Sequence, residues 1–112
     1  MEHLSRYAFA LDLVDDEKSI REYEAYHEKV WPEILESIKE SGIKQMEIYR
    51  IDTRLFMLIE VDASFSLEKK AKTDAGNPKV VEWEKLMWNY QRALPSAKSG
   101  EKWLPMKKIF SL

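Results

Sequence analysis

The segment IKQMEIYRIDTRLFMLIEVDA, residues 43–63, decides the fold of this chain. Residues 43–51 and 54–63 are rich in β-branched and aromatic side chains, which favour β-strands. Only Asp52 and Thr53 separate the two runs, and a connection of two residues is typical of a tight turn between antiparallel strands. The segment therefore predicts a β-hairpin at the centre of the chain.

The residues before the hairpin predict a strand and then a helix. In RYAFALDL, residues 6–13, apolar side chains fall on one face and Arg6 and Asp12 on the other, as in a strand that is buried on one side. Asp15 or Asp16 can cap the N-terminus of the following helix. The inner face of that helix recurs at spacings of three and four residues: Ile20, Tyr23, His27, Val30, Trp31, Ile34, Leu35 and Ile38.

Pro32 interrupts this helical pattern. Proline has no backbone N–H to donate, and it disfavours helical geometry at the residue before it, Trp31. We therefore predict that one helix ends here and that Pro32 opens a second helix. Gly42 is suited to the C-terminus of the second helix, directly before the hairpin.

The residues after the hairpin predict two more helices and a final strand. A helical stretch near residues 66–75 leads to an Asn-Pro pair, which marks a turn. Residues 80–94 form an amphipathic helix that ends at Pro95, and residues 103–112 read as the last strand. One face of the later helix carries Val80, Trp83, Met87, Tyr90 and Leu94.

The predicted order of the main elements is βαββαβ, which is that of the ferredoxin-like α+β fold. It implies one domain over residues 1–112, with a four-stranded antiparallel sheet and helices on one face. The other face of the sheet must be covered by a second copy or line a pocket. In either case we expect a homodimer, assembled as a dimeric α/β barrel.

Composition excludes several functional classes. The chain has 18 basic and 20 acidic residues, so no basic excess is available to bind the phosphates of a nucleic acid. It has no cysteine, which excludes disulfides and thiolate chemistry, and no glycine-rich phosphate loop. No apolar run is long enough for a signal peptide or a membrane span, so we expect a cytoplasmic protein without a membrane partner.

Tyr23 and His27 are the strongest candidates for chemistry. They lie four residues apart on one helical face, and both can move protons, His27 near neutral pH. From spacing alone, a structural role is the commoner outcome, with Tyr23 in the core and His27 at its edge. Glu24 and His27 have the Glu-x-x-His spacing of carboxylate-bridged metal sites, but a second such pair is missing, so we expect no metal. His3, in the N-terminal tail, is given no role.

The aromatic side chains are a second signal. Indole rings stack well on the C–H faces of sugars, and Trp83 is equally suited to core packing. Glu60 and Asp62 alternate with apolar residues on a strand, so they could reach a cavity, although exposure at the end of the strand is the commoner outcome. The chain has five tyrosines and four tryptophans, Trp31, Trp83, Trp88 and Trp103.

Four segments resemble the L-rhamnose mutarotase family, and together they extend from Arg6 to Phe110. The most specific is Tyr-x-x-x-His followed by Val-Trp-Pro-Glu. The resemblance implies a ferredoxin-like dimer that interconverts the α and β anomers of an aldose at C1 without a cofactor. The segments are EYEAYHEKVWPEI, EIYRIDTRLFMLIEV, EWEKLMWNYQRALP and GEKWLPMKKIF.

By position, the resemblance implies that His27 is the catalytic proton donor and that Tyr23 and Trp83 bind the sugar. We expect Trp31, at the break before Pro32, to contact the substrate as well. The chain departs from the best-known branch of the family at two positions. Met46 stands where that branch has a substrate tyrosine, and Glu84 where it has a second tryptophan.

These departures bear on the sugar that the pocket prefers. L-rhamnose is the first expectation, and L-fucose, also a 6-deoxy-hexose, is the main competitor. Two other classes fit the same fold, a cofactor-independent oxygenase and a non-catalytic sensing dimer. If Tyr23 and His27 had no role, the site would lie around Glu60 and Trp83 instead.

Overall fold

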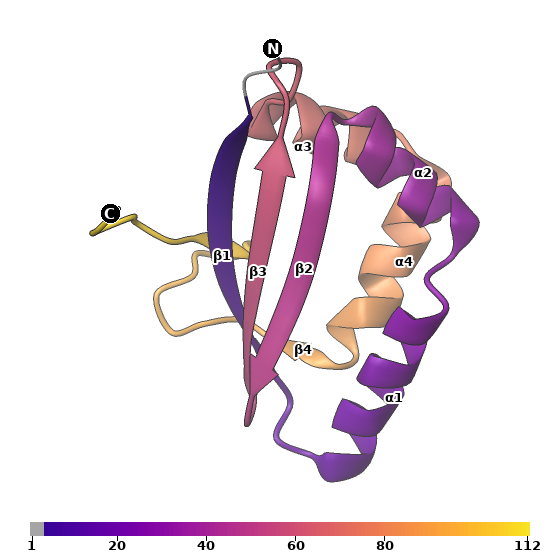
Figure 1. The fold of residues 1–112 in the computed structure, drawn as a ribbon. Coiled ribbons are helices and arrows are strands. Elements are labelled where there is room, and N and C mark those ends of the chain that lie inside the picture. Colours follow the sequence, from indigo (N-terminus) through magenta and orange to yellow (C-terminus); the bar gives the residue numbers. More distant parts are fainter. Residues whose placement is uncertain (1–3) are drawn as a thin grey trace.

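The computed structural model describes residues 4–112, so His3 lies outside the described part of the chain. It contains the strand, the broken helix, the hairpin and the two later helices that the sequence predicts (Figure 1). The elements are β1 (Ser5–Leu13), α1 (Glu17–Glu28), α2 (Pro32–Glu40), β2 (Ile43–Ile51), β3 (Arg54–Val61), α3 (Leu67–Ala75), α4 (Pro78–Trp88), β4 (Gln91–Arg92) and β5 (Leu104–Pro105).

β1 is the central strand of an antiparallel sheet with the order β2-β3-β1-β4. It pairs with β3 from Ser5 to Asp12, and β3 pairs with β2 as the predicted hairpin. The two short strands share the remaining edge of β1, since β4 pairs at Leu13 and β5 pairs at Phe9 and Ala10. The order is that of the ferredoxin-like fold, with the last strand divided into two short pieces.

The predicted break at Pro32 separates α1 from α2. Trp31 has an extended backbone, with φ −56° and ψ 137°, and Pro32 opens the first turn of α2. Asp16 caps α1 by accepting a hydrogen bond from the Ser19 N–H. α1, α2 and α4 lie on one side of the three long strands (Figure 1), so the helices form one layer against one face of the sheet.

The hydrophobic core lies between that layer and the inner face of the sheet. Strand alternation points every second residue of β1 and β3 toward the helices. The side chains of Leu11, Leu13 and Leu55 are almost completely buried there, beside Met87 of α4. They pack in one cluster with Tyr23, Ile34, Val80 and Trp83.

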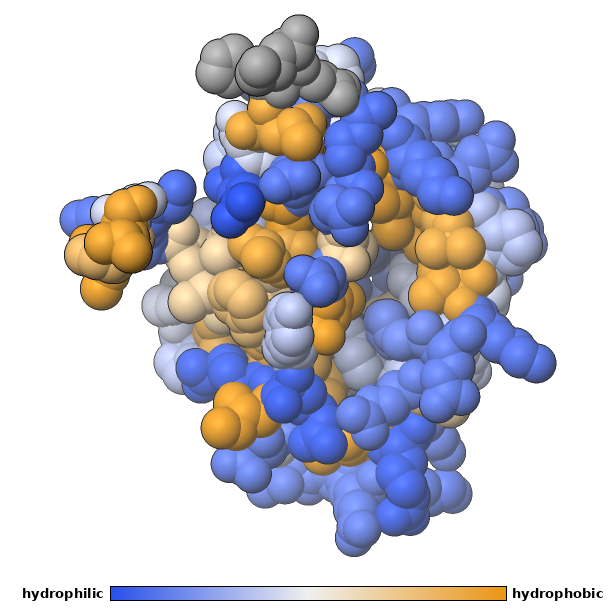
Figure 2. All heavy atoms as spheres, viewed as in Figure 1, coloured by the Kyte–Doolittle hydropathy of each residue, from blue (hydrophilic) through white to orange (hydrophobic). Residues whose placement is uncertain are grey.

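The outer face of the sheet carries Ala8, Ala10, Tyr49, Phe56 and Leu58. No helix of residues 4–112 lies over this face in Figure 1, and Tyr49 is 53% exposed. Figure 2 shows apolar atoms open to solvent over the strands and at the C-terminal segment.

The expected helix over residues 80–94 is wrong at its C-terminal end. α4 ends at Trp88, and the chain turns so that the carbonyl of Tyr90 accepts a hydrogen bond from the Val14 N–H, at 2.8 Å. Gln91 then pairs with Leu13 in the sheet. Pairing with the open edge of β1 takes the place of two further turns of helix.

The expected strand over residues 103–112 is also too long. Only Leu104 and Pro105 form β5, and the Met106 N–H still donates to the carbonyl of Ala8 at 2.8 Å. Pro105 cannot donate a backbone hydrogen bond, and the chain leaves the sheet edge after it (Figure 1). The side chain of Ile109 is 90% exposed.

Candidate active site

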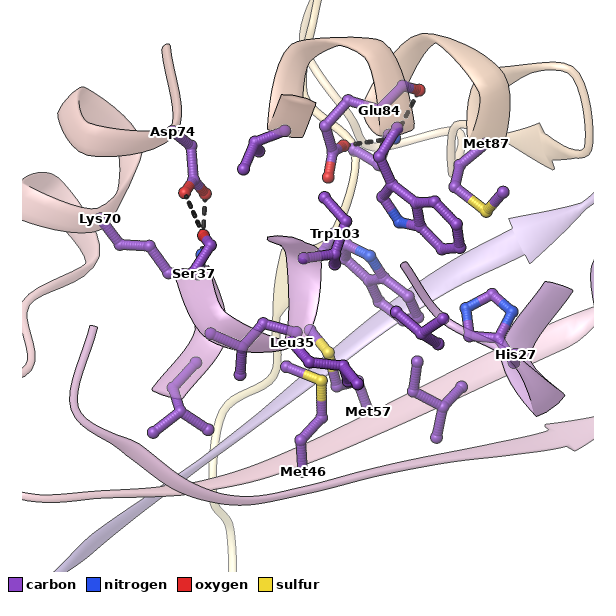
Figure 3. Close-up of a pocket in the computed structure, with 18 of the residues that line it drawn as sticks. His27, Leu35, Ser37, Met46, Met57, Lys70, Asp74, Glu84, Met87 and Trp103 are labelled. Carbon is purple, nitrogen blue, oxygen red and sulfur yellow. Dashed lines mark hydrogen bonds and ion pairs between the residues drawn. The ribbon is translucent and has the colours of Figure 1, made fainter. Parts of the chain in front are cut away.

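A cavity of about 650 Å³ lies between the helical layer and the inner face of the sheet. Its walls come from α1, α2, α3 and α4, its floor from β2 and β3, and one end from β4 and the residues before β5. Figure 3 shows side chains from these elements converging on one space. Of the four predicted site residues, Tyr23, His27 and Trp83 line the cavity.

Tyr23 presents a protonated hydroxyl to this cavity. Its side chain is only 3% exposed, and its hydroxyl accepts a hydrogen bond from Gln91 Nε2 at 3.1 Å. Burial raises the pKa of Tyr23 to about 12, with a smaller contribution from the charge of Glu84, although the Gln91 hydrogen bond works in the opposite direction. The hydroxyl therefore keeps its proton at neutral pH and can donate it in a hydrogen bond.

His27 lies one turn further along α1, and its ring is fixed by the backbone. Nδ1 is 2.8 Å from the carbonyl oxygen of Tyr23. A carbonyl can only accept, so Nδ1 carries a proton, and Nε2 of the neutral ring is free to accept one. The imidazole lies over the Tyr23 ring, with 4.4 Å between the ring centroids. The i, i+4 spacing on one helix thus aligns a proton acceptor with a hydroxyl donor.

Trp83 forms an aromatic wall beside this pair. Its side chain is 6% exposed, and its ring contacts His27 edge-on, with centroids 5.9 Å apart. Trp31 lies behind it and meets the Trp83 ring edge-on at 5.0 Å, while Lys79 lies over the Trp31 ring. Trp31 therefore supports the wall, and it does not itself line the cavity.

Glu84 forms an ion pair with Lys102 at the rim of the cavity. Lys102 Nζ is 2.5 Å from the Glu84 carboxylate and 3.2 Å from the Glu84 carbonyl oxygen, and it lies 4.8 Å from the centroid of the Trp88 ring. Burial lowers the pKa of Lys102, and the charge of Glu84 opposes that shift. The pair connects α4 to the segment before β5.

The floor of the cavity is apolar and adaptable. Met46 of β2 and Met57 of β3 both line it, and Figure 3 shows them on the side away from Glu84. Methionine side chains are flexible and polarisable, so they adjust to irregular ligand surfaces. A different polar group closes the far end, where Ser37 Oγ lies 3.4 Å from Asp74 and Lys70 pairs with Asp74 at 2.8 Å.

The other acidic candidates lie outside the cavity. Glu24 pairs with Arg50 at 3.2 Å, and Glu60 pairs with Arg6 across the sheet at 3.2 Å. Across residues 4–112, no group of three His, Cys, Asp or Glu side chains is arranged to hold a metal ion. None of the described helices is long and apolar enough to cross a membrane.

Sequence reasoning assigned no site role to several residues that line the cavity, among them Gln91, Lys102 and Trp103. Gln91 was not predicted as a cavity residue, because the apolar pattern of α4 continues through Tyr90 and predicts a longer helix. Asn89, a residue type that often follows the last turn of a helix, was the one signal of an earlier end. Lys102 lies in an irregular segment without periodicity, and Trp103 was placed at the start of the predicted last strand, one residue before β5 begins.

The fold and the cavity together define a small ferredoxin-like α+β domain that places Tyr23 and His27 beside the aromatic ring of Trp83. The chain belongs to the L-rhamnose mutarotase family, whose model matches residues 6–112. It is 42% identical over 111 residues to an L-fucose mutarotase of Xanthomonas campestris pv. campestris, covering 97% of this chain and 89% of that protein. It is 40% identical over 111 residues to a UPF0734 protein of Dictyostelium discoideum, covering 95% and 88%.

Several solved structures have a similar fold, among them two enzymes. One is an L-rhamnose mutarotase from Formosa agariphila, with a TM-score of 0.72 and 23% identity, over 96% of this chain and 98% of that one. The other is tetracenomycin F2 cyclase from Streptomyces glaucescens, with a TM-score of 0.64 and 17% identity, over 96% of both chains. The family match confirms the predicted resemblance, and the protein is an isomerase of a family that acts on sugar anomers.

Proposed function

We propose that this protein interconverts the α and β anomers of a 6-deoxy-hexose by opening and reclosing the sugar ring. The observation that carries this proposal is the alignment of Tyr23 and His27 on one face of α1, in a cavity with aromatic walls. L-rhamnose is the first candidate substrate. L-fucose is the second, supported by the 42% identical relative named L-fucose mutarotase and by the departures at Met46 and Glu84.

The proposed chemistry needs two proton movements. The C1 hydroxyl must lose a proton and the ring oxygen must gain one, after which the free aldehyde can rotate and reclose on its other face. His27 is the main proton-transfer group: its Nε2 takes the proton of the C1 hydroxyl as the bond between C1 and the ring oxygen breaks, and it delivers that proton to the ring oxygen, which becomes the C5 hydroxyl. Tyr23 donates a hydrogen bond to the ring oxygen and does not act as a base, since its pKa of about 12 keeps it protonated.

The walls of the cavity suit such a sugar. Trp83 offers its indole to the C–H face of the ring, and Met46 and Met57 provide an apolar floor for the methyl group at C6. Glu84 and Lys102 offer charged groups to the hydroxyls at the rim. The cavity volume lies within the range of small-molecule sites.

His27→Ala tests the proposal directly. Anomer exchange of L-rhamnose and L-fucose, measured by saturation-transfer NMR, should fall by roughly 10²–10⁴-fold, as expected for the loss of an acid–base group. Glu24→Ala is the matched control, because Glu24 lies on the same helix and pairs with Arg50 outside the cavity. A folded His27→Ala protein with the exchange rate of the parent would refute the assignment.

The same measurement separates the two candidate sugars. L-rhamnose and L-fucose share the methyl group at C6 and differ in configuration at C2 and C4. Exchange that is faster for L-fucose at equal concentration would make L-fucose the preferred substrate. Exchange that stays at the spontaneous rate for both sugars would refute the proposed activity on these substrates.

We also propose that two copies assemble through the outer face of the sheet. The support is that apolar side chains on this face, Tyr49 among them, are open to solvent on a single chain. A sheet face of this kind is usually covered by another layer. The C-terminal segment adds the exposed side chains of Ile109 and Phe110.

A further inference from the structure

Gln91 is a buried polar side chain with an unused hydrogen-bonding atom. It is 6% exposed, and among residues 4–112 it is the one polar residue in the buried class. Its Oε1 has no hydrogen-bond partner in the described part of the chain. The same side chain lines the cavity beside Tyr23 and His27.

An unpaired buried amide oxygen is unfavourable, because it has lost its water and gained no donor in exchange. Rotating the amide of Gln91 by half a turn does not remove the problem. Its side chain bonds to a single group, the hydroxyl of Tyr23, so either orientation leaves one polar atom without a partner. Because Gln91 lines the cavity, rotation about its side-chain bonds can bring this buried oxygen to a ligand.

The backbone holds Gln91 firmly in this position. β4 pairs Gln91 with Leu13 at the edge of the sheet, and the preceding carbonyl of Tyr90 accepts a hydrogen bond from Val14 at 2.8 Å. The early end of α4 is what brings the side chain to the cavity. A helix continued to residue 94 would lack this pairing with β1.

Gln91 and Tyr23 together present a donor and an acceptor side by side. Gln91 Nε2 donates to the Tyr23 hydroxyl, so the proton of that hydroxyl is directed away from Gln91 and toward a ligand. Gln91 Oε1 is a free acceptor next to it. A sugar at this position must offer an oxygen without a proton and, close to it, a hydroxyl.

The anomeric end of an aldopyranose meets this requirement. Its ring oxygen carries no proton and matches the donor Tyr23. The single proton of the C1 hydroxyl is taken by His27 in the proposed reaction. The next hydroxyl available to an acceptor is the one at C2.

We propose that Gln91 binds the sugar by accepting a hydrogen bond from the C2 hydroxyl, while its Nε2 orients the Tyr23 hydroxyl toward the ring oxygen. This assignment rests on the proposed function. It makes Gln91 a residue that determines specificity, because C2 is one of the two carbons at which L-rhamnose and L-fucose differ. A hydroxyl in the other configuration points elsewhere and leaves Oε1 unpaired.

The test is Gln91→Met, which keeps the length of the side chain and removes both polar atoms. Anomer exchange at sub-saturating sugar should fall roughly five- to hundredfold for the preferred 6-deoxy-hexose, as expected for one buried hydrogen bond. The 2-deoxy analogue of that sugar lacks the C2 hydroxyl, so its exchange should fall by a smaller factor, from the loss of the Tyr23 contact alone. Arg92→Met is the matched control, since Arg92 is the neighbouring residue of β4 and is exposed.

Thermal unfolding separates a binding role from a structural one. Gln91→Met removes the unpaired Oε1, which favours the fold, and also the Nε2 hydrogen bond to Tyr23, which does not, so the two effects should nearly cancel and the Tm should change little while exchange falls. A lower Tm together with equal loss on both sugars would assign Gln91 a structural role and overturn the proposal. An unchanged exchange rate in Gln91→Met, beside an active parent, would overturn it as well and leave the proposed function intact. A parent protein without exchange activity would overturn the proposed function, and the C2 contact with it.

Discussion

Tyr23 is a core residue and a cavity residue at the same time. Its ring packs in the main hydrophobic cluster, while its hydroxyl meets Gln91 at the cavity wall. Burial that raises its pKa to about 12 also makes the stability of the fold depend on pH. The hydroxyl of Tyr23 stays neutral in the folded protein over a pH range in which the same tyrosine of the unfolded chain is already ionised.

The sign of this effect follows from proton binding. The unfolded tyrosine releases its proton near pH 10, whereas the folded one holds it to about pH 12, so the contribution is fully present below pH 10 and is lost as pH rises through 12. Two pKa units correspond to about 2–3 kcal/mol. Urea unfolding between pH 9 and 12 should show this loss in the parent and much less of it in Tyr23→Phe. Tyr7→Phe, at an exposed tyrosine, should retain the alkaline loss, and equal slopes in all three proteins would contradict the prediction.

At the scale of elements, Gly42 joins α2 to the hairpin in a conformation that needs glycine. Its φ is +99°, and a Cβ there would lie 2.6 Å from Asp62 Oδ1 and 2.7 Å from Ser64 Oγ. The Asp62 oxygen is held in place by hydrogen bonds from the backbone and the hydroxyl of Ser64. A side chain at residue 42 would therefore clash with the turn at Asp62 and Ser64, whose hydrogen bonds resist displacement.

Gly42→Ala should lower the free energy of unfolding by about 2–4 kcal/mol, from backbone strain plus the displaced turn. Gly100→Ala is the matched control. Gly100 also has a positive φ, +84°, but no atom lies within 4 Å of the position of its Cβ, so strain alone should cost about 1 kcal/mol. Chemical denaturation of both variants measures the difference. Equal losses would show that the contacts with the turn are unimportant.

The sequence was most informative where a local rule and the tertiary structure agree. Pro32 determines the break between α1 and α2, and the two residues at 52 and 53 determine the hairpin, because both effects act within a few residues. The end of α4 depends on the open edge of β1, which is far away in the sequence. No local pattern indicates that the edge of β1 is free, so β4 and the short length of β5 could not be predicted, although a last strand was.

The residues of the candidate site also fall into those that local sequence could predict and those that it could not. His27 and Tyr23 share one helix, so their spacing was sufficient to predict that they lie together. Gln91 and Lys102 arrive from separate segments, and their contacts depend on how those segments close against the sheet. Glu84, which the resemblance aligns with a second tryptophan of the best-known branch, pairs with Lys102, and no pattern in the sequence indicated that partner.

At the scale of the whole molecule, the outer face of the sheet governs the proposed assembly. The parent protein should sediment as a dimer at micromolar concentration, because association removes apolar side chains from water. Phe56→Lys places a charge on this face and should shift the protein to monomer. Val81→Lys, on the exposed side of α4, should leave the dimer intact. A parent that sediments as a clean monomer would contradict the proposal.

The position of the cavity has a consequence for such a dimer. Within residues 4–112, the side chains that line it lie between the helices and the inner face of the sheet. Two copies joined through their outer faces would hold their sugars at opposite extremes of the particle, with both sheets between them. Each protomer would then bind sugar independently of the other. The dependence of the exchange rate on sugar concentration would therefore be hyperbolic, with a Hill coefficient of about one.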